Sequence, residues 1–136
     1  INFCKTLTKD IDFFCGDAVD LPFSENSFDI ITNVESIGYY DPVESYVECA
    51  FRCLKKDGLL VEAIVGDAEE FEYLNKAFKH RKKILELDVT PNVRLECGIS
   101  KYMFLGVHHL FATVSYNDEQ RYLTDETRYK IIVYKK

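Results

Sequence analysis

Short apolar runs separated by polar stretches predict that this chain is an α/β protein. Residues 11–15 and residues 28–32 are brief apolar runs next to turn-forming residues, which is typical of buried strands. Residues 59–65 are apolar at nearly every position, as expected for a strand that is covered on both faces.

Two segments have the three- and four-residue apolar spacing of amphipathic helices. We expect the first to begin with Asp41 as N-cap and Pro42 as first helical residue, and to end at Gly58 as a left-handed cap. Its apolar face consists of Val43, Tyr46, Val47, Ala50, Phe51 and Leu54. The second begins with a capping box from Asp67 to Glu70. Its apolar face consists of Phe71, Leu74, Phe78 and Leu85, with the cations of residues 80–83 on the solvated face.

The last third of the chain predicts a reversed strand. Residues 97–105 are a weaker helix candidate, because glycines lie in and after them. Residues 110–115 and 129–134 are apolar, and the hydrophilic stretch between them lacks the pattern of a crossover helix, so we expect an antiparallel hairpin. The predicted sheet is mostly parallel with an antiparallel last strand. Such sheets bind ligands at the carboxyl ends of their strands, here residues 16–17, 33–40 and 66–67.

Composition and charge narrow the function. The net charge of −6, with both signs spread along the chain, argues against a nucleic-acid partner. No apolar stretch is long enough to span a membrane, so we expect no membrane partner. The five cysteines contain no C-x-x-C pair, which indicates free thiols and a cytoplasmic location. Cys97, His108 and His109 have irregular spacing and no evident fourth ligand, so we expect no metal site.

An ordered set of motifs resembles one enzyme family. The motifs are Gly-Asp-Ala and Leu-Pro-Phe within residues 14–23, Ser-Phe-Asp at residues 27–29, and Arg-x-Leu-Lys-x-x-Gly at residues 52–58. In this order and spacing they resemble class I S-adenosylmethionine-dependent methyltransferases, closely over residues 10–67 and in outline beyond. The resemblance implies a Rossmann-like, doubly wound sheet and S-adenosylmethionine as the cofactor.

One departure from the family pattern stands out. The family's Gly-rich cofactor turn after its first strand is absent, and no Gly-x-Gly occurs anywhere in the chain. The chain also begins at Ile1 rather than Met. We therefore expect residues 1–136 to be a single, incomplete methyltransferase domain that lacks the N-terminal strand–helix–strand and is inactive alone. Partners expected are the missing portion and a second copy in a homodimer.

The resemblance implies where the cofactor binds. Asp17 would accept a hydrogen bond from the adenine amino group, and the backbone N–H of Ala18 would meet a ring nitrogen. Asn33 and Val34, which follow the strand at residues 28–32, would contact the methionine end. The alternative for Asp17 is a purely local role, in which its carboxylate caps its own loop.

The same resemblance points to the reacting end of the site. Glu35 would be the catalytic residue, as a base toward the nucleophile or as a carboxylate that stabilises a cation, and the alternative is a solvated loop carboxylate. Tyr39 and Tyr40 would bind substrate over the transferred methyl, because aromatic faces favour cations. The alternative is that they pack against the following helix.

We therefore expect methyl transfer to a small, partly apolar metabolite by in-line displacement. The loop from Asn33 to Ser36 resembles subgroups that methylate sterols, isoprenoids and natural products. The Arg-Cys-Leu-Lys stretch at residues 52–55 and Glu35 also resemble cyclopropane fatty-acid synthases. One rival is a non-catalytic, methyltransferase-like partner or scaffold. A nucleotide-dependent oxidoreductase is a second rival, against which the Gly-Asp-Ala and Leu-Pro-Phe motifs argue.

Overall fold

The computed structural model describes residues 3–8, 10–93 and 126–136. In this part the helices are α1 (Cys4–Leu7), α2 (Val43–Cys53) and α3 (Ala68–Ala77), with a short 3₁₀ helix, η1, at Ile37–Tyr39. The strands are β1 (Phe28–Val34), β2 (Leu54–Gly66), β3 (Lys82–Asp88) and β4 (Arg128–Lys135).

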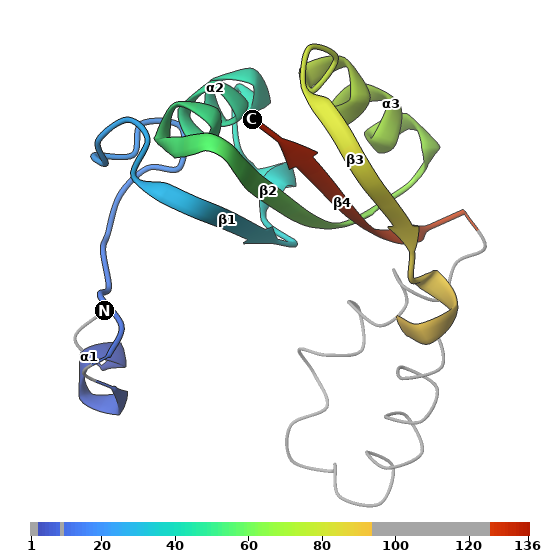
Figure 1. The fold of residues 1–136 in the computed structure, drawn as a ribbon. Helices are drawn as coiled ribbons and strands as arrows, with labels where there is room; N and C mark the ends of the chain where they lie inside the picture. The colour runs from blue at the N-terminus through green and yellow to red at the C-terminus, as the bar shows by residue number, and fades with distance from the viewer. Residues whose placement is uncertain (1–2, 9, 94–125) are drawn as a thin grey trace, which may run out of the picture.

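The four strands form one sheet in the order β1-β2-β4-β3 (Figure 1). β1 and β2 are parallel, whereas β4 is antiparallel to both β2 and β3. The predicted parallel pairing of residues 28–32 with 59–65 is confirmed, and so is the reversed last strand. A mixed sheet of this kind is the Rossmann-like arrangement with one antiparallel strand.

Helices α2 and α3 lie on the same face of the sheet (Figure 1). Alternate residues of β2 point into this layer, and Leu60, Glu62 and Ile64 are buried there. The stacked rings of Phe78 and Tyr134 lie 4.3 Å apart between centroids, at the other end of the same core. The apolar stripe predicted for α2 is therefore the face that packs on the sheet.

The opposite face of the sheet is more open in the described part of the chain. The intervening residues of β2 are only half-buried, and Ile30 and Val34 of β1 are 57% and 62% exposed. The expectation that residues 59–65 are covered on both faces is wrong for these residues, because both described long helices pack on one side.

Residues 11–15 do not form the predicted strand. Ile11 and Phe14 are exposed, and the segment leads away from the sheet toward α1 (Figure 1). An apolar run alone does not form a strand, because the backbone N–H and C=O groups of a strand need a neighbouring strand as their hydrogen-bond partner. In the described residues β1 pairs only with β2, and no strand is paired with residues 11–15.

Helix α2 begins and ends earlier than predicted. Pro42, not Asp41, is the N-cap, and the helix gives way to β2 at Leu54. Gly58 is therefore no helix cap; the residue with positive φ is Asp57, at 66°. A Cβ on Gly58 would lie 2.9 Å from the Lys55 carbonyl oxygen and 3.0 Å from that of Asp29, so close backbone approach requires glycine.

The capping box of α3 is confirmed, but the helix is shorter than predicted. Asp67 Oδ1 accepts from the N–H groups of Glu69 and Glu70, and the Glu70 side chain accepts from Asp67 N. The helix ends at Ala77, and Leu85 belongs to β3, where it pairs with Val133. The cations of residues 80–83 thus lie in a turn and a strand, because pairing with β4 overrides the local helical period.

The expected antiparallel hairpin between residues 110–115 and residues 129–134 is wrong for β4, the strand of the pair that the structure describes. Both edges of β4 are occupied, one by β2 and the other by β3. The proposed partner strand at residues 110–115 and the helix candidate at residues 97–105 lie outside the described residues, as do Cys97, His108 and His109.

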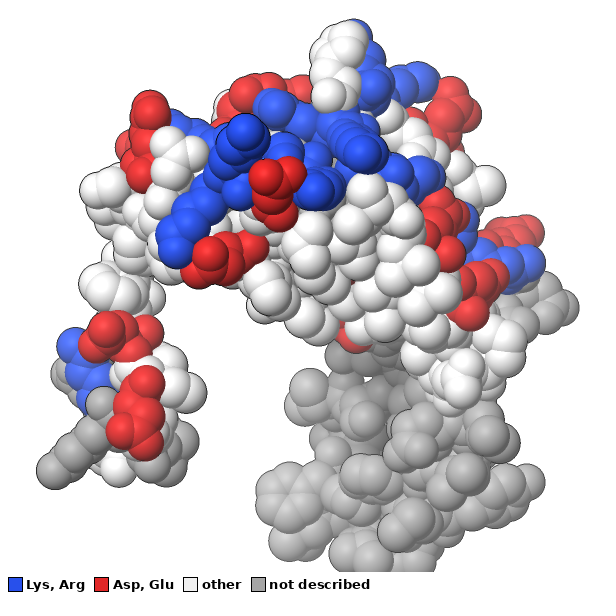
Figure 2. All heavy atoms as spheres, in the orientation of Figure 1, with Lys and Arg blue, Asp and Glu red and all other residues white. Residues whose placement is uncertain are grey.

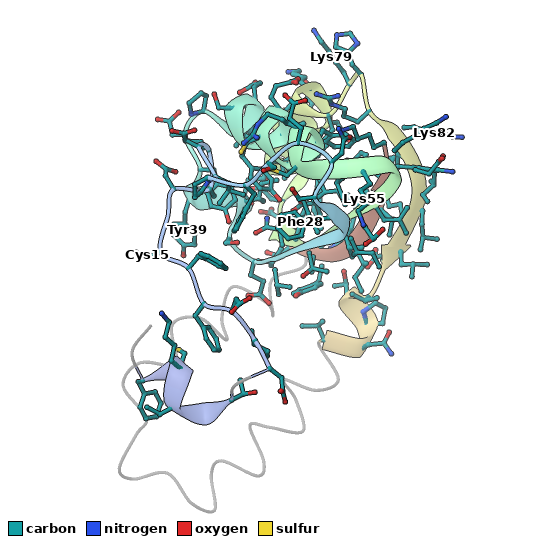
Figure 3. The ribbon with its side chains drawn as sticks, turned by 60° about the vertical axis from the view of Figure 1, so that its left-hand side comes forward. Cys15, Phe28, Tyr39, Lys55, Lys79 and Lys82 are labelled. Atoms are coloured by element: carbon teal, nitrogen blue, oxygen red, sulfur yellow. The ribbon has the colours of Figure 1, made fainter. Side chains whose placement is uncertain are left out.

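Folding gathers cations that are dispersed in the sequence. Figure 2 shows Lys and Arg clustered over the part of the surface where β2 and β3 begin and β4 ends. The pairs Lys55–Asp29 and Lys135–Asp57, both 2.9 Å long, neutralise part of this basic edge. Lys79 and Lys82 project outward there (Figure 3). This basic edge lies at the end of the sheet opposite the carboxyl ends of β1 and β2. No described helix is long and apolar enough to cross a membrane.

Candidate functional site

The chain turns sharply at the carboxyl end of β1. Glu35 has φ of 52°, a left-handed conformation that is uncommon outside glycine and frequent at functional sites. Its N–H donates to the Ala63 carbonyl oxygen at 2.8 Å, so this residue is still tied to β2. A hollow of about 110 Å³ opens beside it, lined by Glu35, Ile37, Gly38, Tyr39, Ile64 and Val65. A hollow therefore lies at the strand ends, where the sequence predicts the site. A second hollow, of about 480 Å³, lies between α2 and the loop that contains Val19 and Asp20.

Tyr129 of β4 holds the Glu35 carboxylate. The Tyr129 hydroxyl donates to Glu35 Oε1 at 2.8 Å. Partial burial, together with this hydrogen bond, raises the pKa of Tyr129 to about 12, so the phenol stays protonated and remains a donor. Sequence reasoning missed Tyr129, because 94 positions separate the two residues and only sheet pairing brings them together.

A buried polar cluster lies beneath this turn. Asn33 Nδ2 donates to Glu62 Oε2 at 2.8 Å, and the Tyr46 hydroxyl donates to Glu62 Oε1 at 2.6 Å. Glu62 is fully buried, and that burial raises its pKa to about 7, although both hydrogen bonds act to lower it. The pKa of Tyr46 is also raised, first by burial and then by the nearby Glu62. A lone carboxylate inside the apolar run of residues 59–65 was the sequence signal for this cluster.

Two residues that follow Glu35 also hydrogen-bond to the buried polar cluster. The hydroxyls of Ser36 and Tyr40 both donate to Asn33 Oδ1, the second at 3.0 Å. The Tyr40 ring packs on Tyr46, with centroids 4.6 Å apart. Tyr40 is thus placed as a packing aromatic, which is the alternative that the sequence left open. Tyr39 is 84% exposed and lines the hollow instead (Figure 3).

The Asn33 side chain is committed to Glu62, Ser36 and Tyr40. A contact between Asn33 and a cofactor would therefore come from its backbone. Val34 is largely exposed next to it, at the end of β1. The structure thus brings Asn33, Val34, Glu35 and Tyr39 together at one strand end.

Asp17 and Ala18 lie on a separate loop ahead of β1. Asp17 Oδ1 accepts from Val19 N at 3.1 Å, which is the local capping role considered as an alternative. The loop is fixed to α2 by Arg52, whose guanidinium donates to the carbonyl oxygens of Phe23 at 2.7 Å and Leu21 at 2.8 Å. Arg52 of the Arg-x-Leu-Lys motif therefore holds the loop that carries Asp17.

Among residues 3–8, 10–93 and 126–136, no group of three or more His, Cys, Asp or Glu residues could hold a metal ion. The chemistry that the described site offers is that of one oriented carboxylate beside an apolar and aromatic hollow. Such a site can attract a cation, accept a proton and exclude water from a small methyl-sized group.

Methyltransferases are among the known proteins that are similar to part of this chain. Residues 1–62 match a family model described as "Methyltransferase domain". A "Probable phthiotriol/phenolphthiotriol dimycocerosates methyltransferase 2" of Mycobacterium ulcerans is 35% identical over 72 residues, which cover 52% of this chain and 28% of that protein. The chain thus spans well under half of this curated relative.

Solved structures share the fold. The cyclase SpnF aligns with 98% of this chain and 61% of its own, at a TM-score of 0.73 and 18% identity. Geranyl diphosphate C-methyltransferase from Streptomyces coelicolor, solved with Mg²⁺, geranyl diphosphate and S-adenosyl-L-homocysteine, aligns with 87% of this chain and 50% of its own. Its TM-score is 0.67 at 16% identity. Together with the ordered motifs and the reversed strand β4, these matches show that residues 1–62 are similar to a methyltransferase domain and that the chain shares its fold with these solved structures.

Proposed function

We propose that the full-length protein transfers the methyl group of S-adenosylmethionine to a small, partly apolar acceptor. The observation that carries this proposal is Glu35, a carboxylate turned by a left-handed backbone into the mouth of an apolar hollow and held there by Tyr129. A carboxylate beside an apolar wall fits a sulfonium cation and its methyl group.

The described residues divide into two groups by role. Asp17 and the backbone of Ala18 receive the adenine, on a loop that Arg52 fixes. The backbones of Asn33 and Val34 meet the methionine end at the close of β1. For Asp17, one carboxylate oxygen already accepts from Val19, so the adenine amino group requires the other oxygen.

Catalysis then depends on position more than on covalent chemistry. S-adenosylmethionine supplies an electrophilic methyl group on a sulfur that leaves with the bonding electron pair. Glu35 takes the proton that the acceptor releases, or stabilises the positive charge when no proton is released. The hydrogen bond from Tyr129 to Oε1 holds the Glu35 carboxylate beside the hollow. The apolar side chains of Ile37 and Ile64 exclude water from the methyl path.

The test is methyl transfer by the full-length protein, with labelled S-adenosylmethionine and a panel of small apolar alcohols, acids and alkenes. We expect Glu35→Gln to lower kcat about tenfold or more while cofactor affinity changes less, since charge is lost but size is kept. Glu72→Gln, which alters an exposed carboxylate on α3 paired with Lys76, is the matched control and leaves kcat unchanged. Unchanged turnover in Glu35→Gln would make Glu35 a solvated loop carboxylate.

The alternative function is a non-catalytic, methyltransferase-like partner. A cyclase shares this fold, so the fold alone does not determine methyl transfer. Calorimetry separates the two functions. A full-length protein that binds S-adenosylmethionine but methylates nothing in the panel favours the partner role.

A further inference from the structure

We infer that Glu62, a buried residue of β2 that touches neither the hollow nor the loop of Asp17, is a positioning residue for the turn that carries Glu35. The inference rests on the proposed function of Glu35. Burying a carboxyl group in the core lowers the stability of the protein, so the presence of Glu62 there calls for a structural reason.

The geometry connects Glu62 to the turn through one residue. Glu62 Oε2 accepts from Asn33 Nδ2 at 2.8 Å, which fixes the orientation of the Asn33 amide. The opposite end of that amide, Oδ1, then faces the turn and accepts from Ser36 and Tyr40. If the amide were reversed, two hydroxyl donors would face an NH₂ group, and Glu62 would face a carbonyl oxygen.

Glu35 lies between the two residues that this relay fixes. Asn33 precedes it by two positions and Ser36 follows it directly, and their side chains are hydrogen-bonded to each other. A left-handed conformation at a non-glycine residue is strained and persists only where its surroundings impose it. The Asn33–Ser36 bond, anchored by Glu62, closes the turn over Glu35 and so directs its carboxylate toward Tyr129 and the hollow.

Tyr46 has a different part in the cluster. It donates to the other oxygen of Glu62, at 2.6 Å, and lies on α2. It therefore fixes Glu62 against the helix layer. The complete chain of contacts runs from the helix layer through Tyr46, Glu62 and Asn33 to the turn.

The experiment measures the turn directly, by hydrogen exchange in the full-length protein. The reporters are the amides of Glu35 and Tyr39, which donate to Ala63 and Ser36 at 2.8 Å and 3.0 Å. In Glu62→Met, which removes the acceptor but keeps the volume, we expect both amides to exchange about tenfold faster or more. In Glu62→Gln, whose carbonyl still accepts from Asn33, we expect exchange close to wild type. This rescue distinguishes a need for the acceptor from a need for the charge.

The control is Leu60→Ala, which opens a cavity in the same buried row of β2 but removes none of the hydrogen bonds of the relay. It destabilises the core, so equal acceleration in Leu60→Ala and Glu62→Met would overturn the inference. Should Glu62→Met fail to fold, Ser36→Ala removes the turn's own bond to Asn33 and leaves the buried carboxyl satisfied. Faster exchange at Glu35 then supports the relay, and unchanged exchange overturns it.

Turnover adds a second measurement. If Glu35 acts as proposed, Glu62→Met lowers kcat about tenfold, Glu62→Gln restores it, and Leu60→Ala leaves it unchanged. Faster exchange without any effect on kcat would retain the relay but remove the role proposed for Glu35. The two proposals therefore fail separately.

Discussion

Replacing Glu62 with Gln should make the protein more stable at alkaline pH and leave it nearly unchanged in acid. Burial raises the pKa of Glu62 from 4.5 to about 7 in the folded protein. Between these two values the folded state holds a proton that the unfolded state has released. The stability that the neutral carboxyl provides is thus fully present below pH 4.5, and it is lost as the pH rises through about 7.

The size of the effect follows from the difference between the two pKa values. At about 1.4 kcal/mol for each pH unit, wild type loses roughly 3 kcal/mol relative to a residue that cannot ionise. Gln resembles the neutral carboxyl: its carbonyl accepts from Asn33, and its NH₂ group donates to the Tyr46 oxygen. The difference in free energy of unfolding, Glu62→Gln minus wild type, should therefore be about 1 kcal/mol at about pH 5 and should rise to about 3 kcal/mol at about pH 8.5.

The assay is urea unfolding of both full-length proteins, followed by far-UV circular dichroism across this pH range. Subtracting the two curves removes the titration of all other groups. Glu72→Gln is the control, because the hydrogen bond from Lys76 lowers the pKa of Glu72 and its difference curve has no slope in this range. If the difference in free energy of unfolding for Glu62→Gln also stays constant with pH, then ionisation of Glu62 does not destabilise the core and the reasoning is refuted.

Three further predictions test the loop that carries Asp17, the capping box of α3 and the close backbone approach at Gly58. Asp17→Ala should weaken binding of S-adenosylmethionine to the full-length protein about ten- to a hundredfold by calorimetry, since an acceptor for the adenine is lost; unchanged affinity would leave Asp17 only its local bond to Val19. Asp67→Ala should lower the free energy of unfolding by about 1 kcal/mol in urea, because the capping box of α3 loses its acceptor, and Asp67→Asn should recover most of it. Gly58→Ala should cost about 1–3 kcal/mol in the same assay, because its Cβ would lie 2.9 Å from the Lys55 carbonyl oxygen; Gly38→Ala, where nothing lies within 4 Å, is the matched control.

The sequence by itself determined what depends on local pattern. The apolar stripe of α2, the capping box at Asp67 and the apolar run of β2 are local signals, and each produced the expected element. The position of the candidate site is likewise a prediction from the sequence, because the carboxyl ends of parallel strands coincide at one edge of a sheet. The motifs at residues 14–23 and 52–58 predicted the resemblance to methyltransferases.

Only the tertiary structure decided what depends on pairing between distant segments. Residues 11–15 have the composition of a strand but no described neighbour. Leu85 has helical spacing from Phe78 but belongs to β3, because β4 offers an edge for pairing. The same pairing brings Tyr129 to Glu35, and Asn33 to Glu62. Backbone and side-chain hydrogen bonds across a sheet join residues by register rather than by spacing along the chain. The residues that orient the candidate catalytic carboxylate therefore became visible only once the strands were paired.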